Sequence, residues 1–581
     1  MSKQALLITL VVLLAIVAKA ADENLSHPQV DKIFADLQKP GSPGCALGVF
    51  RDGKIIYSKG YGLASVEVNA PIVPQTVFDI GSTSKQFTAT SILLLERQGK
   101  LSLDDDVRKY IPELPDYSRA GYHRITILNL LNHTSGLRDY LSLLGMAGVN
   151  GDSVTTDEDA LSLVAHQKHL NFAPGSEWRY SNTGYFLLSV IVKRVAGMSL
   201  REFAVKNIFQ PLDMTHTTFR DDHTMLISGR ALAYDPGEKT GYKLDVSYFE
   251  QLGDGAVHTS VEDLAKWDEN FYSGKLGGKG LVAELQEPGK LDNGKQLKYA
   301  KALFISDDRG LRTVRHGGAW GGYRAELLRF PDQHFSVACL CNLANADPEK
   351  RADQVAEIFL GSLMKPKESA ALDSANLKAT AGIPLDQAQM AHVSGIYRDP
   401  EKTTIARVSI VKDKLQWEIY GGKFALLALS PTEFRSIDFP IEAKLTFETG
   451  ADHAVHDLKI SGDEQINATY QAVKEFQPSA RELATYTGDF QSDELGVIYR
   501  LKVVDGNLTL VALADASGLP RTGLRVPTVL RPTIAHEFEV AILGSTVDFL
   551  KDAQGAVTGF NLDSGRTQGI QFTRIAGTVH H

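Results

Sequence analysis

The sequence predicts a multidomain protein in which a mixed domain of helices and strands is followed by two antiparallel β modules. At 581 residues the chain is too long for a single hydrophobic core. Helical and strand-like apolar patterns intermingle up to about residue 364, and short alternating runs typical of β-strands follow residue 389. The Lys- and Ala-rich residues 365–389 break the apolar periodicity, so we interpret them as a linker.

The part of the chain after this linker contains an internal repeat. The run that begins at Gly395 recurs at Gly488, and Lys414-Leu415 recurs as Asn507-Leu508, with the same offset of 93 residues (488 − 395 and 508 − 415). Each copy has the length and strand density of a small antiparallel barrel, in which closure removes exposed strand edges. We therefore expect one β-barrel module at residues 390–476 and a second at 477–577.

The first twenty residues have the three regions of a secretory signal peptide. Lys3 lies in a short charged start, an apolar run covers residues 5–17, and Ala18-Lys19-Ala20 provides a small-residue cleavage site. The apolar run is short for a membrane-spanning helix. We expect cleavage after Ala20, no stable membrane insertion afterwards, and an exported protein that is periplasmic or secreted.

Composition and cysteine usage exclude several classes of function. A net charge of −9 provides no basic surface for nucleic acid, so we expect no nucleic-acid partner. Of the three cysteines, Cys339 and Cys341 are neighbours on one strand and poorly placed to bond each other. A bridge from Cys45 is one alternative, but we interpret all three as buried free thiols. Because no Cys/His cluster has zinc spacing, we predict no metal and no cofactor.

A serine and a lysine three residues apart stand where a buried helix is predicted to begin. Ser82 and Lys85 lie just before the apolar run 87–95, and this spacing puts both side chains on one helical face, where Lys85 can act on the Ser82 proton. Ser362 and Ser409 also precede a lysine by three residues. Ser362 ends a helical stretch, and Ser409 lies in a strand-like run where residues three apart face opposite sides. Ser82 is therefore the candidate nucleophile.

Two further short motifs complete a candidate site. Tyr180-Ser181-Asn182 precedes an apolar helical run, and His316-Gly317-Gly318 lies on a strand-like segment, where glycines allow a substrate backbone to approach closely. A second candidate for the last motif is Lys239-Thr240-Gly241. We reject it because its neighbours have the composition of a surface hairpin turn.

In this order, Ser-x-x-Lys, Tyr-x-Asn and His-x-Gly resemble the motifs of the penicillin-recognising serine hydrolases. That superfamily contains class C β-lactamases, penicillin-binding DD-peptidases, D-aminopeptidases and β-lactamase-like esterases, and the resemblance covers residues 28–362. It implies a β-lactamase-like α/β domain at residues 21–364, with an antiparallel sheet flanked by helices and a helical subdomain. A hydrolase followed by two β modules is similar to the three-domain D-aminopeptidases, which implies that both modules are eight-stranded, lipocalin-like barrels.

The resemblance also implies a role for each motif residue. Ser82 would be acylated, while Lys85 and Tyr180 would share the acid/base work. Asn182 would orient Lys85 and the substrate amide. The backbone N–H groups of Ser82 and Ala319 would form the oxyanion hole, beside Gly318.

His316 departs from the lysine that many relatives carry at this position. A histidine has an ordinary pKa near 6.5 and is largely neutral at pH 7, so it supplies no permanent cation for a substrate carboxylate. From this departure we expect a limb in the pH–rate profile near neutrality, governed by His316.

The function favoured by these features is that of an exported serine hydrolase acting on D-amino-acid-containing peptides or amides. One alternative is a β-lactamase-like esterase or a β-lactamase, and another is a slow-turnover penicillin-binding or sensor-like protein. The partner is in each case a small peptide, amide or ester, and the sequence does not specify an oligomeric state.

The second β module is longer than the first between equivalent residues. Leu508 to Phe538 exceeds Leu415 to Phe434 by 11 residues (30 − 19), and the extra length lies within residues 515–528. A surface loop is one interpretation. The resemblance implies the other, a lid over the catalytic site. In such a lid Asp515 would meet a substrate ammonium or, as the alternative, Arg521 or Arg525 would favour an acidic group.

Overall fold

The computed structural model describes residues 27–237, 241–366, 382–401, 404–419, 421–437, 443–462, 467–513, 527–540 and 544–575. The chain divides into two compact units. The first contains residues up to Leu103 together with Leu188–Pro366, and the second contains Asp104–Leu187 together with the chain from Lys367 onward. Residues 1–20, most of the linker and the candidate lid residues Asp515, Arg521 and Arg525 lie outside the described residues.

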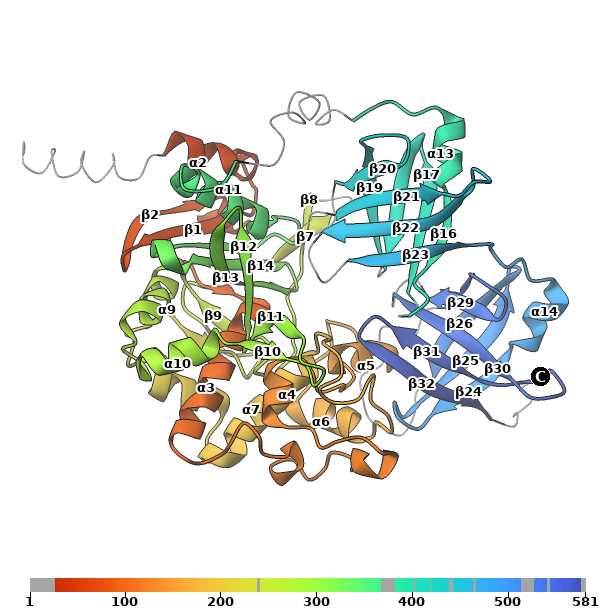
Figure 1. The fold of residues 1–581 in the computed structure, drawn as a ribbon, viewed down its shortest axis with the longest axis horizontal. Helices are drawn as coiled ribbons and strands as arrows, with labels where there is room; N and C mark the ends of the chain where they lie inside the picture. Colours follow the sequence, from red (N-terminus) through yellow and green to blue (C-terminus); the bar gives the residue numbers. More distant parts are fainter. Residues whose placement is uncertain are drawn as a thin grey trace, which may run out of the picture. The chain divides into compact units, whose positions relative to one another are not determined.

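The first unit is built around an eight-stranded antiparallel sheet with the order β10-β11-β12-β13-β14-β15-β1-β2 (Figure 1). One face of its centre packs against helices α2 and α11, in a core that includes Phe34, Leu47, Val337 and Val355. The opposite face of β1 lies close to α9. A Cβ added to Gly48 of β1 would be 3.1 Å from a side-chain atom of Val261, the first residue of α9. The bounds are β1 (Cys45–Arg51), β2 (Lys54–Tyr61), β10 (Pro288–Lys290), β11 (Gln296–Ala300), β12 (Leu303–Asp308), β13 (Leu311–Trp320), β14 (Tyr323–Phe330), β15 (Phe335–Cys341), α2 (Pro28–Ile33), α9 (Val261–Ser273) and α11 (Pro348–Leu360).

The central strands of this sheet correct our expectation for the cysteines. Cys45 and Cys341 lie directly opposite each other on β1 and β15, and they form a disulfide. Cys339 is the free, buried thiol. The expectation of three free thiols was wrong because it had no information on strand pairing: the two bonded residues are 296 positions apart in the chain.

The remaining elements of the first unit include the helix that follows Ser82. Within that helix, α3, Phe87 packs against Phe209 and Trp267, so the helix is held in an aromatic core. The bounds are η1 (Ala35–Gln38), η2 (Gly81–Ser84), α3 (Lys85–Arg97), α8 (Leu200–Ala204), η5 (Val205–Phe209), α10 (Gly278–Leu285), η6 (Pro331–Gln333), and the short strands β3 (Leu63–Ser65), β4 (Ala70–Pro71), β5 (Phe78–Asp79), β6 (Thr218–Phe219), β7 (Tyr234–Gly237), β8 (Gly241–Leu244) and β9 (Val257–Thr259).

A helical segment opens the second unit. Its helices begin at side-chain caps on Thr126, Asp139 and Thr156, each of which accepts a hydrogen bond from a backbone N–H in the first turn. The bounds are η3 (Val107–Lys109), η4 (Tyr117–Ala120), α4 (Ile127–Leu131), α5 (Tyr140–Met146), α6 (Asp157–Ala165) and α7 (Asn182–Ala196), which carries the chain back into the first unit.

The first C-terminal module is a closed barrel of eight antiparallel strands paired in chain order, as predicted. Its interior contains Trp417, Phe434, Leu445 and Tyr470, all at most 1% exposed. The bounds are β16 (Gly395–Arg398), β17 (Ile405–Val411), β18 (Lys414–Ile419), β19 (Gly422–Ala428), β20 (Glu433–Ser436), β21 (Ala443–Thr449), β22 (Val455–Gly462) and β23 (Ala468–Val473).

The second module is a nine-stranded antiparallel sheet whose two end strands, β27 and β28, belong to one chain segment. Strand β27 pairs with β26 and strand β28 pairs with β29, and only the buried Leu530 separates β27 from β28. The two ends of the sheet are therefore neighbouring pieces of one chain segment. The bounds are β24 (Gly488–Ser492), β25 (Val497–Val504), β26 (Asn507–Leu513), β27 (Thr528–Val529), β28 (Arg531–Pro532), β29 (Glu537–Val540), β30 (Ser545–Lys551), β31 (Val557–Ser564) and β32 (Thr567–Arg574).

The 93-residue repeat extends to a helix in front of each barrel. Helix α13 (Gln387–Val393) and helix α14 (Ala480–Thr485) begin 93 residues apart (480 − 387), and both start at a capping box, on Asp386 and Ser479. Helix α13 packs Met390 and Val393 into the first barrel. It begins inside the segment that we interpreted as a linker.

Among the described residues, no single helix is long and apolar enough to cross a membrane. Helix α7 and the helical stretch Leu200–Phe209 reach that length and composition only as a pair, bent by 75°.

Candidate active site

Ser82 and Lys85 lie at the junction of the one-turn helix η2 with helix α3. Ser82 is half-buried in this turn, whereas the Lys85 side chain is fully buried. The Lys85 Nζ donates to the Ser82 Oγ at 2.9 Å and to the backbone oxygen of Asp254 at 2.6 Å. The second contact fixes the lysine against the protein interior, so that its amine is held beside the serine hydroxyl.

The backbone of strand β13 packs directly against the backbone of this turn. The Thr83 hydroxyl donates to the backbone oxygen of His316 at 3.0 Å. A Cβ on Gly318 would collide with the backbone oxygen of Ile80, and one on Gly81, which has φ +48°, would lie 2.6 Å from the Ala319 nitrogen. Glycine at both positions therefore allows the strand and the turn to pack backbone against backbone.

This packing places the exposed Ala319 beside the turn that carries Ser82. Backbone N–H groups that converge on one point beside a nucleophile can hold the oxyanion of an acyl-transfer intermediate. Within the first unit, the structure thus brings together five of the predicted site residues: Ser82, Lys85, His316, Gly318 and Ala319.

His316 is buried and hydrogen-bonded as a neutral imidazole. The residue is only 3% exposed. Its Nδ1 donates a hydrogen bond to the Gly317 backbone oxygen at 2.6 Å, and its Nε2 accepts one from the Tyr299 hydroxyl at 3.3 Å. Burial, together with the nearby Lys85, lowers the pKa of His316 to about 3. The expectation that His316 governs a limb of the pH–rate profile near neutrality is therefore wrong, because the sequence does not reveal this burial.

Sequence reasoning missed a buried acidic group under the nucleophile turn. The Asp79 Oδ1 accepts a hydrogen bond from the Gly81 N–H at 2.8 Å, and its Oδ2 lies 4.0 Å from the Nε2 of His258. Burial raises the pKa of Asp79 to about 6 and lowers the pKa of His258 to about 3. Asp79 thus supports the turn through the Gly81 N–H, and its place two residues before Gly81 is the signal that could have identified it.

Tyr180 and Asn182 lie at the start of helix α7 in the second unit. The Tyr180 residue is 8% exposed, and its ring packs 4.2 Å from the ring of His133, measured between centroids. The Asn182 N–H donates to the Asp139 Oδ2 at 2.6 Å. These contacts fix the Tyr180 ring and the backbone of Asn182.

The loop that holds this motif has an unusual backbone conformation. His133 has φ +56°, a left-handed conformation, and its Nδ1 accepts a hydrogen bond from the Ser181 N–H at 3.3 Å. Asp139 both caps helix α5 and accepts from the N–H of Asn182. His133 and Asp139 are thus positioning residues that sequence reasoning did not assign.

The second barrel contributes another unassigned residue to this region. The guanidinium of Arg566 lies over the Tyr180 ring, 5.0 Å from its centroid. The sequence contains no motif at this position, and only the folded barrel shows that Arg566 reaches the helical segment.

Two groups of side chains in the described residues have ligand atoms close enough to hold a metal ion. The first is Cys45, Cys339 and Cys341, two of which are consumed by the disulfide. The second is Asp222, His223 and Glu250, in which the His223 Nδ1 lies 2.7 Å from the Glu250 Oε1. Neither group contains a residue of the predicted site.

Comparison with known proteins identifies similar sequences. The profile of the Beta-lactamase family matches residues 30–360. Penicillin-binding protein 4* of Bacillus subtilis is 30% identical over 424 residues, which are 69% of this chain and 89% of that protein. The D-aminopeptidase of Brucella anthropi is 28% identical over 301 residues, which are 52% of this chain and 56% of that protein.

A solved structure supports the fold. The octameric penicillin-binding protein homologue from Pyrococcus abyssi superimposes with a TM-score of 0.53 at 24% identity, covering 77% of this chain and 98% of that one. At this level of identity the likeness is one of architecture.

Proposed function

This chain belongs to the Beta-lactamase family of serine hydrolases, and on that basis we propose that it is an exported hydrolase of D-amino-acid-containing peptides or amides. The observation that carries the proposal is the 2.9 Å contact between the Lys85 Nζ and the Ser82 Oγ, in a turn that packs against Gly318 and Ala319 of β13.

In the first half-reaction, the Ser82 Oγ attacks the carbonyl carbon of the scissile amide and forms a C–O bond. The hydroxyl proton passes to the acid/base pair Lys85 and Tyr180, while the N–H groups of Ser82 and Ala319 stabilise the oxyanion. The C–N bond then breaks as Tyr180 returns a proton to the leaving nitrogen. The product is an ester between Ser82 and the acyl group.

In the second half-reaction, water attacks the carbonyl carbon of this ester. Tyr180 accepts a proton from the water, the bond to the Ser82 Oγ breaks, and the serine recovers its proton. Asn182 orients Lys85 and the substrate amide in this scheme. The charge of the catalytic groups is therefore unchanged over the cycle.

The relatives support the choice of substrate class. Two proteins similar to this chain carry the names penicillin-binding protein and D-aminopeptidase, and the second has the substrate stereochemistry in its name. The β-barrels that follow the hydrolase domain agree with the three-domain architecture expected for that group.

The disulfide supports export. Cys45 and Cys341 are bonded within the most buried part of the sheet, and structural disulfides of this kind persist mainly in oxidising compartments. The segment 1–20 has the composition of a signal peptide, which would direct the chain there.

A substrate panel tests the proposal. We would measure kcat/KM for matched D- and L-aminoacyl amides, a short p-nitrophenyl ester and a chromogenic β-lactam. The proposal predicts turnover of the ester and a preference for D- over L-amides. Turnover of esters with no amide hydrolysis would instead favour the esterase alternative, and hydrolysis of the L-amides at equal rate would contradict the proposed substrate class.

A further inference from the structure

The hairpin β31–β32 of the second barrel reaches the helical segment and carries an arginine to Tyr180. Its turn consists of Gly565 and Arg566, because Ser564 pairs with Thr567. The Arg566 side chain is exposed and its guanidinium lies 5.0 Å from the centroid of the Tyr180 ring. A cation over the face of an aromatic ring is attracted by the ring electrons, so this contact orients the guanidinium.

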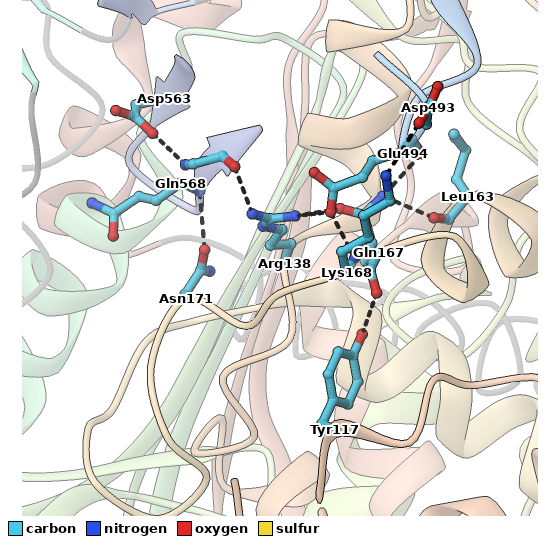
Figure 2. A network of polar contacts seen from close by, with 11 residues as sticks. Tyr117, Arg138, Leu163, Gln167, Lys168, Asn171, Asp493, Glu494, Asp563 and Gln568 are labelled. Atoms are coloured by element: carbon cyan, nitrogen blue, oxygen red, sulfur yellow. Dashed lines mark hydrogen bonds and ion pairs between the residues drawn. The ribbon is translucent and has the colours of Figure 1, made fainter. Parts of the chain in front are cut away.

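The turn is anchored through its backbone, which leaves the arginine side chain available. The Arg566 backbone oxygen accepts hydrogen bonds from the Asp139 N–H at 3.3 Å and from the Asn171 Nδ2 at 2.9 Å. The Gln568 N–H donates to the Asn171 Oδ1 at 3.0 Å, a contact visible in Figure 2. Asp139 therefore contacts both the hairpin and Asn182, so the two are held by one residue.

A buried ion pair fixes the same barrel to the same helical segment. The Arg138 Nη1 donates to the Glu494 Oε1 at 2.7 Å, and both side chains are at most 3% exposed (Figure 2). Arg138 also donates to the Gly569 backbone oxygen at 2.9 Å, just after the hairpin turn. The Gln167 Nε2 donates to the Glu494 backbone oxygen at 3.1 Å. Hence two loops of the barrel are clamped against the segment that leads to Tyr180.

Arg566 differs from Arg138 in its lack of a carboxylate partner. Within the described residues, Arg566 makes no ion pair, and its guanidinium lies over the Tyr180 ring. Arg138, by contrast, is neutralised by Glu494. An oriented guanidinium without a counter-ion is suited to bind a carboxylate, because its planar N–H groups match the two carboxylate oxygens.

The position on β13 where many relatives carry a lysine provides no cation in this chain. His316 occupies the position where many relatives carry a lysine, and its pKa is lowered to about 3 by burial, so it is uncharged at neutral pH. A substrate carboxylate therefore finds no positive charge at His316.

We propose that Arg566 is a specificity-determining residue that binds a carboxylate on the leaving-group side of the substrate. The proposal rests on the function proposed above, in which Tyr180 protonates the leaving nitrogen. In a leaving group of one amino acid the free carboxylate carbon is two bonds from that nitrogen, about 2.5 Å away. The guanidinium over the Tyr180 ring is within reach of a group at that distance. The favoured substrates are thus short peptides with a free C-terminal carboxylate.

The test uses two matched substrates and one matched control variant. The substrates are N-acetyl-D-alanyl-D-alanine and its C-terminal carboxamide, which differ only in charge. The variants are Arg566→Gln, Arg566→Lys and Arg574→Gln. Arg574 is the control because its guanidinium also lies 5.0 Å from an aromatic centroid of the same barrel, that of Phe490.

We expect Arg566→Gln to lower the ratio of kcat/KM for the carboxylate over the carboxamide about tenfold or more, through a rise in KM, as loss of a charge-assisted contact does. Arg566→Lys should retain part of this ratio, and Arg574→Gln should retain all of it. The thermal unfolding midpoint of each variant checks that it folds.

An unchanged ratio in Arg566→Gln overturns the inference, and so does an equal loss on both substrates, which would show that Arg566 only supports Tyr180. These results are distinct from failure of the proposed function. That failure would be the absence of Ser82-dependent acylation by a p-nitrophenyl ester in the unmodified protein.

Discussion

Replacement of His316 by glutamine removes one buried titratable group and should change how stability depends on pH. In the folded protein burial lowers the pKa of His316 to about 3, whereas in the unfolded chain it is close to 6.5. Between these values the unfolded chain binds a proton that the folded protein excludes. The contribution of His316 to stability is therefore complete above pH 6.5 and is lost as the pH falls toward 3.

The size of this effect follows from the two pKa values. Each pH unit between them corresponds to about 1.4 kcal/mol, so the unmodified protein should lose about 2 kcal/mol between pH 7 and pH 5 through this group alone. His316→Gln lacks the proton-binding group. The difference in stability between the two proteins should shift by that amount over this range. Because residue 316 is only 3% exposed, solvent screening does not weaken this effect appreciably.

Hydrogen–deuterium exchange of the peptide covering β13 measures this difference locally, which avoids treating a multidomain protein as a two-state system. Exchange of both proteins is compared at pH 7 and pH 5 after correction for intrinsic rates. A stability difference that is the same at both pH values would show that His316 titrates normally, and would refute the argument that it is a buried neutral group.

Two further predictions concern the strand that packs against the nucleophile turn and the disulfide of the central sheet. Gly318→Ala should lower kcat/KM on a p-nitrophenyl ester by about 100-fold or more, because the new methyl group meets the Ile80 backbone and displaces the neighbouring Ala319 N–H. Gly317→Ala is the control, because its Cβ would meet a side-chain oxygen of Glu326 at 3.0 Å and no backbone atom closer than 3.6 Å; an equal effect of both variants would contradict this role. Cys341→Ala should destabilise the protein by about 2–5 kcal/mol and make its thermal midpoint insensitive to reductant, whereas Cys339→Ala should keep that sensitivity; loss of the sensitivity in Cys339→Ala would contradict the observed pairing.

The fold was predictable from the sequence where the signal is local or repeated. Strand β17 covers the run around Ser409, and β18 and β26 begin at Lys414 and Asn507, the two positions that define the 93-residue repeat. The contact between Lys85 and Ser82 is likewise local, because three residues along a helix return nearly to the same face. The capping boxes at Asp386 and Ser479 carried the same repeat and were missed.

Features that depend on distant parts of the chain were not predictable in this way. The bond between Cys45 and Cys341 requires knowledge that β1 pairs with β15. The neutrality of His316 results from burial by elements such as Tyr299, and burial is a property of the packed structure. Arg566 reaches Tyr180 only because the barrel docks on the helical segment, so no motif in the sequence indicated it.

Acylation of Ser82 is the most direct test of the central claim that this chain is a serine hydrolase using the Ser82–Lys85 pair. The intact mass of the protein is recorded during incubation with a p-nitrophenyl ester and after a chase in buffer, for the unmodified protein and for Ser82→Ala. We expect the unmodified protein to gain one acyl group, located on the peptide that contains Ser82, and to lose it during the chase. Ser82→Ala should fold with the same thermal midpoint and gain no label. Equal labelling and equal turnover in Ser82→Ala would contradict the assignment of the nucleophile.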